Sequence, residues 1–176
     1  GALERRRPTL RGGFRDRVFV AGNPQNQRDP FRFEISRSPE IGAVTDRFVG
    51  PGLHVVQGVA LRKDEFADER FARAAVVHLA IPGVIDLTSP ERSRLLLAAA
   101  ADAADGARGS WIGADPADYL SPADVAAFEL DAELLLLSAT GITGNGASPF
   151  AGRVPLVSDF LDAGAAVVLF SLWPAG

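Results

Sequence analysis

The stretch AAVVHLAIPG, residues 74–83, decides the fold of this 176-residue chain. Its continuous apolar run predicts a strand that is buried on both faces, as in a parallel sheet. The run closes at Pro82-Gly83, a pair that favours a turn. His78 lies in the middle of the run, and we expect its ring to be packed and hydrogen-bonded in the core rather than to face a substrate.

Four more apolar runs predict the other strands of the same sheet, at residues 17–21, 54–58, 133–139 and 165–172. Helices are predicted between them. Ser38-Pro39-Glu40 and Ser121-Pro122 each combine an N-cap serine with a first-turn proline, and Asp124 completes a capping box in the second segment.

Two further segments read as helices. Residues 63–73 place Phe66 and Phe71 on one side of a charged helix, and residues 154–163 end at Gly164, a residue type that commonly follows a helix. Strands that alternate with helices predict an α/β layer fold, with a mostly parallel sheet and helices on both faces. Between residues 85 and 120 the sequence pattern does not decide the secondary structure, because Arg94–Ala98 fits either an edge strand or the start of a helix.

The composition excludes several classes of protein. A hydrophobic fraction of 47% and a charged fraction of 23% fit one compact domain, and no apolar run is long enough to span a membrane. Without cysteine there is no disulfide, thiolate metal site or cysteine nucleophile. Two histidines cannot form a three-histidine zinc site, so we expect no metal and no cofactor.

Charge is unevenly distributed along the chain. Residues 1–100 carry 16 basic and 12 acidic side chains, whereas residues 101–176 carry 2 and 10. The arginines near the N-terminus could face an acidic partner or phosphate. A solvated end segment is the favoured interpretation, because no aromatic residues accompany them to stack on bases, and nucleic acid is therefore not an expected partner.

In a parallel sheet, ligands gather at the carboxyl ends of the strands. The residues predicted there, with the polar residues of the two central strands, form the candidate binding set: Asn23, His78, Gly83, Ser138, Thr140, Gly141, Gly144 and Gly146. The segment Thr140–Gly146 is predicted to be a loop, which could cradle a phosphate, hold a nucleophile or be a plain turn. The phosphate interpretation is weak, because neither glycine-rich nucleotide motif is present.

Five separated segments, in the right order, resemble the CHAT domain family. They are VFVAGNPQ (18–25), HVVQGVALRKDEF (54–66), AAVVHLAIPG (74–83), ELLLLSATGITGNG (133–146) and FLDAGAAVVLFSLWPAG (160–176). The resemblance implies a caspase-like fold, related to separase, caspases and gingipains, and an association with tetratricopeptide repeats. In active members a histidine at the end of one strand and a cysteine at the end of a second strand form the catalytic dyad. By this resemblance the histidine falls on Pro82 and the cysteine on Thr140.

The resemblance therefore predicts a pseudopeptidase without catalytic residues, acting as a protein-binding, scaffolding or regulatory module in the cytoplasm. Its partner would be a protein or peptide. Residues 1–16 would be an extension or linker, and residues 17–176 would be a single domain, cut short at its C-terminal side. Alternatives stay open: a structural domain without a ligand, a small-molecule or nucleotide binder at residues 140–146, or a repurposed hydrolase. The hydrolase would use Ser138 or Thr140, with His78 or His54 as base and Asp86 as orienting acid, although Ser138 and His78 need not meet.

Overall fold

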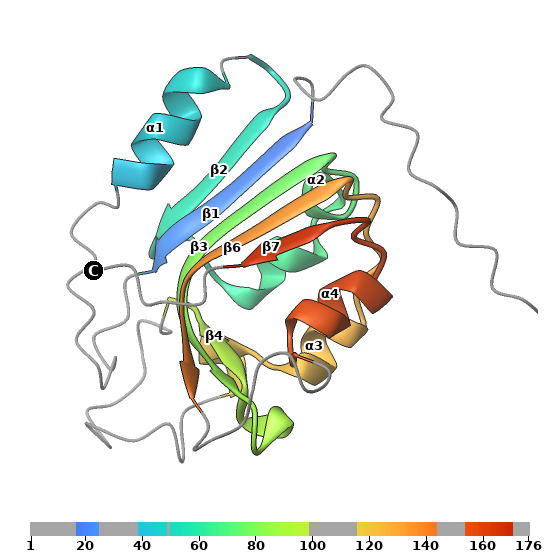
Figure 1. The fold of residues 1–176 in the computed structure, drawn as a ribbon. Helices are drawn as coiled ribbons and strands as arrows, with labels where there is room; N and C mark the ends of the chain where they lie inside the picture. The colour runs from blue at the N-terminus through green and yellow to red at the C-terminus, as the bar shows by residue number, and fades with distance from the viewer. Residues whose placement is uncertain (1–16, 25–38, 49, 99–115, 144–153, 171–176) are drawn as a thin grey trace, which may run out of the picture.

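A computed structural model describes residues 17–24, 39–48, 50–98, 116–143 and 154–170, which form a mostly parallel sheet (Figure 1). Five parallel strands follow one another in the order β2-β1-β3-β6-β7, and two short antiparallel strands, β4 and β5, extend from β3. The strands are β1 (Val18–Pro24), β2 (Leu53–Gly58), β3 (Val76–Asp86), β4 (Arg94–Leu96), β5 (Tyr119–Leu120), β6 (Leu134–Thr143) and β7 (Val168–Phe170). The predicted α/β sheet is confirmed.

Helices cover both faces of this sheet (Figure 1). They are α1 (Pro39–Arg47), α2 (Glu69–Ala72), α3 (Pro122–Ala126), α4 (Val157–Asp162) and the 3-10 helices η1 (Lys63–Ala67), η2 (Pro90–Arg92) and η3 (Pro116–Asp118). Side chains of α1 pack with one apolar cluster, and side chains of η1, α2, α3 and α4 pack with another. Successive residues of a strand point to opposite faces, so Phe19 joins the second cluster while Val18 and Val20 join the first.

The predicted helix over residues 63–73 is two helices instead. Asp68 is extended, with φ −72° and ψ 140°, and its carboxylate accepts a hydrogen bond from the backbone N–H of Arg70. This N-cap ends η1 and opens α2. Phe66 and Phe71 are both buried, as expected, but they reach the core from two short helices.

Other local predictions are confirmed. Ser121 and Asp124 form the capping box of α3, with Ser121 N donating to Asp124 Oδ2 at 2.8 Å. Gly164 follows α4 with a φ of +119°, the left-handed conformation that favours glycine after a helix. The open segment Arg94–Ala98 contains a strand, β4, rather than the start of a helix, but β4 lies between β3 and β5 and is not an edge strand.

The turn predicted at Pro82-Gly83 and the loop predicted from Thr140 are wrong. Strand β3 continues through Pro82 and Gly83 to Asp86, and β6 continues to Thr143. The ladder between β3 and β6 shifts register between Ala80 and Gly83, a bulge that matches the missing N–H of Pro82. Beyond the bulge, β4 pairs with Gly83 and Val84, so β3 keeps partners on either side, β4 on one and β6 on the other.

Gly83 is required where these strands meet. A Cβ at this position would lie against the carbonyl oxygen of Arg94 and 2.9 Å from Cδ2 of Leu95. Only a residue without a side chain lets β4 approach β3 this closely. The sequence thus places a glycine next to Pro82 for packing, not for a turn.

Candidate functional site

The two positions at which the resemblance places a catalytic dyad lie on neighbouring strands. Pro82 is buried in the bulge of β3, and the next residue, Gly83, pairs in register with Thr140 of β6. Proline has no titratable group, so position 82 cannot hold or transfer a proton. Thr140 belongs to the described backbone, but its side chain lies outside the described set.

The other predicted binding residues are only partly brought together. Asn23 lies in β1 and Gly141 in β6, where Gly141 pairs with Val84. Gly144 and Gly146 lie outside the described residues. The candidate loop of residues 140–146 is therefore a strand for its first four residues, which does not leave them free to wrap around a phosphate.

His78 is the centre of a polar cluster on the α1 face of the sheet. Its side chain is buried, and its Nε2 lies 2.8 Å from Oε1 of Glu40 and 3.3 Å from Oγ of Ser138. The three residues come from β3, α1 and β6. The expectation of a packed, hydrogen-bonded His78 agrees with this geometry.

The expectation that Ser138 and His78 need not meet is wrong. Ser138 pairs in register with Ala80, two residues after His78 on β3, so the two side chains share a face and lie diagonally. Sequence reasoning placed Glu40 only near a helix N-terminus and missed its contact with His78. The available signal was Glu40 itself, an acid in the first turn of α1, the helix that covers this face of β3.

The bonding of His78 opposes a catalytic triad. An ionised Glu40 only accepts hydrogen bonds, so the Nε2 of His78 must carry the proton and donate it. Ser138 then meets an N–H rather than a lone pair, because both partners lie at the same nitrogen. A nucleophile–base–acid triad needs the serine and the acid at opposite ring nitrogens. The cluster instead ties α1 to the two central strands.

The other groups named for a hydrolase are occupied elsewhere. His54 contacts Arg70 and the ring of Phe19, in the region of α2. Asp86 accepts hydrogen bonds at Oδ1 from the backbone N–H groups of Ser89 and Thr88, each at 2.9 Å, and these bonds lower the pKa of its carboxyl group. Asp86 therefore holds the turn after β3, and none of its hydrogen bonds goes to a histidine.

No group of three or more histidine, aspartate or glutamate side chains in the described ranges could hold a metal ion. In the same ranges no helix is long and apolar enough to cross a membrane.

An α/β layer fold with a mostly parallel sheet and helices on both faces is the fold expected of a caspase-like, peptidase-related class of domain. A family comparison agrees, since the family described as CHAT domain matches residues 2–176. The chain belongs to the CHAT domain family. A comparison with curated proteins finds no match. The boundary between an extension at residues 1–16 and a domain from residue 17 stays a prediction.

Proposed function

We propose that this CHAT domain is a pseudopeptidase, which binds a protein or peptide and does not cleave it. The observation that carries the proposal is the chemistry of the two adjacent positions. Pro82 cannot accept a proton, and a threonine hydroxyl at position 140 needs a neighbouring base to act as a nucleophile. The whole chain contains no cysteine that could replace it.

The proposed binding surface is the end of the sheet around the β3 bulge. The long strands β3 and β6 run side by side there, and β4 adds an antiparallel neighbour. In this proposal the sheet end without its dyad binds a peptide segment and lacks the chemistry to cut it. A protein with tetratricopeptide repeats is one proposed source of the bound segment, and the cytoplasm is the proposed compartment.

The test is to incubate the purified protein with a peptide library, collect the retained peptides and determine their masses. We expect retained peptides of unchanged mass, because binding occurs without hydrolysis. Cleaved peptides would contradict the proposal, provided that Thr140→Ala abolishes the cleavage. Ser138→Ala is the matched control, since it removes a hydroxyl from the same strand.

A repurposed serine hydrolase is the second candidate, and the contact between Ser138 and His78 favours it. The hydrolase is opposed by the burial of His78 and by the fact that Glu40 and Ser138 both contact the same ring nitrogen, Nε2 of His78. A fluorophosphonate probe separates the two candidates. Labelling that disappears in Ser138→Ala supports the hydrolase, and no labelling leaves the pseudopeptidase as the better account.

A further inference from the structure

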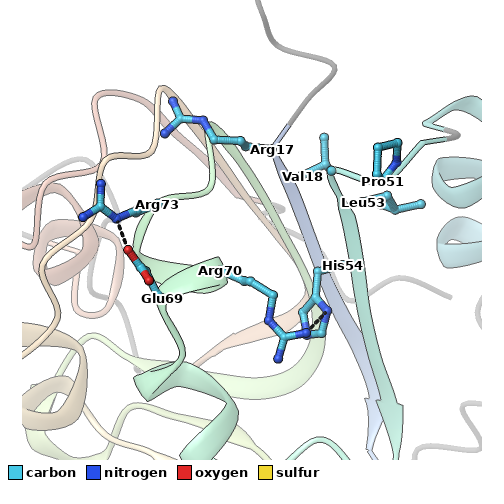
Figure 2. Close-up of a pocket in the computed structure, with 9 residues that line it drawn as sticks. Arg17, Val18, Pro51, Leu53, His54, Glu69, Arg70 and Arg73 are labelled. Carbon is cyan, nitrogen blue, oxygen red and sulfur yellow. Dashed lines mark hydrogen bonds and ion pairs between the residues drawn. The ribbon is translucent and has the colours of Figure 1, made fainter.

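A pocket of about 410 Å³ lies at the opposite, amino-terminal end of the sheet, away from the Pro82–Thr140 positions. Figure 2 shows the side chains that line it, including Arg17 before β1, His54 on β2, and Arg70 and Arg73 at α2. Its volume lies in the range of small-ligand pockets, roughly 300–1,000 Å³. Guanidinium groups dominate the polar lining.

Arg70 is held in place before any ligand arrives. Its Nε and Nη2 donate to the two carboxylate oxygens of Asp68 at 2.9 and 2.6 Å, and its Nη1 donates to Nδ1 of His54 at 3.1 Å. Since arginine only donates, Nδ1 of His54 is the acceptor of this hydrogen bond. Three of the five N–H groups of Arg70 are used by these bonds, and two remain for a ligand.

The charges of the lining leave one unmatched cation. Glu69 lines the pocket and forms an ion pair with Arg73 at 2.6 Å. Asp68, which is not part of the lining, forms an ion pair that neutralises the charge of Arg70. Arg17 is exposed, and no carboxylate of the described residues pairs with it. A singly charged anion therefore matches the site better than a doubly charged phosphate.

The guanidinium groups of the lining favour a carboxylate as the bound anion. Leu53 packs with the apolar cluster on the α1 face, and Figure 2 shows Pro51 and Leu53 on the other side of β1 and β2 from the guanidinium groups, so these two residues do not supply apolar contacts to a ligand bound there. Arginine pairs with carboxylates through two parallel hydrogen bonds, and this geometry gives both affinity and orientation. A glutamate or aspartate side chain presents such a carboxylate on a short apolar stem.

We propose that this pocket binds a carboxylate side chain of an acidic peptide segment from a partner protein, with Arg17 as the principal contact. The site is separate from the surface of the proposed function, because it lies at the other end of the strands. Loss of binding here would leave the pseudopeptidase proposal untouched.

The test uses a labelled glutamate-rich peptide and its glutamine counterpart, titrated with the full chain by fluorescence anisotropy. We expect the glutamate peptide to bind at least about tenfold more tightly than the glutamine peptide, and binding to weaken as salt rises. Inorganic phosphate is the competing probe and should displace the peptide poorly. Equal binding of the two peptides, or efficient displacement by phosphate, would overturn the proposal.

Three variants locate the site. Arg17→Gln should weaken binding of the glutamate peptide about fivefold, since it removes a guanidinium group that no carboxylate of the described residues neutralises. Glu69→Gln should strengthen it about twofold to fivefold, because it removes a competing carboxylate from Arg73. Arg92→Gln, an exposed arginine of η2, is the charge-matched control and should leave the affinity unchanged. Equal effects of Arg17→Gln and Arg92→Gln, or weaker binding by Glu69→Gln, would contradict the assignment.

Discussion

The two faces of the sheet are built differently. On the face covered by α2, α3 and α4, aromatic rings pack into a continuous core, and the ring of Phe71 lies 5.1 Å from both Phe19 and Phe66 and 5.2 Å from Phe128. On the face covered by α1 the apolar cluster is smaller, and buried His78 interrupts it. We expect the first face to supply most of the stability and the second to depend on the polar cross-link at His78.

The largest effect is expected from Phe71→Ala. Truncating this fully buried ring should lower the free energy of unfolding by about 3–5 kcal/mol, because it removes the aromatic contacts and leaves a cavity. Urea denaturation measures it. Phe48→Ala, a partly buried phenylalanine that packs on the α1 face, is the control and should cost less than half as much. Equal losses would contradict the claimed difference between the faces.

Gly83→Ala should be the next most damaging change. The new methyl group meets the backbone of β4, which cannot move aside as a flexible side chain would, so a cost of about 1–3 kcal/mol is expected. Thermal unfolding of the variant checks it. Gly42→Ala in α1 meets nothing within 4 Å and should instead stabilise the protein by roughly 0.5–1 kcal/mol. A neutral Gly83→Ala would show that the strands are not packed as described.

A double-mutant cycle measures the cross-link on the α1 face. Alanine substitutions at Glu40 and His78, singly and together, should give a coupling energy of about 1 kcal/mol, because a buried ring donates to a carboxylate. The exposed pair Glu69–Arg73 is the control, with an expected coupling of about 0.3–0.5 kcal/mol. If the exposed pair couples more strongly, the buried contact does not anchor α1.

The smallest effect is a loss of stability in acid. The pKa of Asp124 is lowered: burial raises it, but bonds from Lys63 and Ser121 outweigh burial. The arginine at position 70 lowers the pKa of Asp68 well below its usual range. A lowered folded-state pKa stabilises the protein above the ordinary value of 3.8, and that stability is lost as the pH falls further.

The measurement is the free energy of unfolding between pH 7 and pH 2.5. We expect little contribution from these two carboxyl groups to the slope above about pH 5 and a decline below pH 4. Asp124→Asn should flatten the decline, since it removes one of the titrating groups. Asp46→Asn, an exposed residue of α1, is the control. An unchanged decline in Asp124→Asn would contradict the role of its bonds to Lys63 and Ser121.

Local sequence rules predicted much of this fold. Apolar runs located the five parallel strands. The pair Ser121-Pro122, with Asp124 completing a capping box, located the helix α3. Those rules failed where tertiary pairing decides the outcome. Pro82-Gly83 resembles a turn, but the partner strands on both sides keep β3 extended. The helix predicted over residues 63–73 is interrupted at Asp68, because this residue is extended and caps the start of α2.

The candidate site shows the same limit. Family resemblance paired Pro82 with Thr140, and their neighbouring backbone positions fit that pairing. The contacts of His78 with Glu40 and Ser138 depend on how α1 crosses the sheet and on strand register. Neither property can be deduced from the spacing of these residues along the chain. The arginine pocket is also assembled from distant segments, and only its basic residue types were visible in the sequence.

The central claim is that a peptidase-like sheet end is present and that its dyad positions are Pro82 and Thr140. The most direct test is the double variant Pro82→His/Thr140→Cys, treated with a thiol-directed peptidyl inhibitor and assayed for peptide cleavage, with Thr140→Cys alone as the control. We predict labelling or cleavage that requires both changes, because a histidine at position 82 would activate the new thiol. A folded double variant that reacts no faster than Thr140→Cys would contradict the claim.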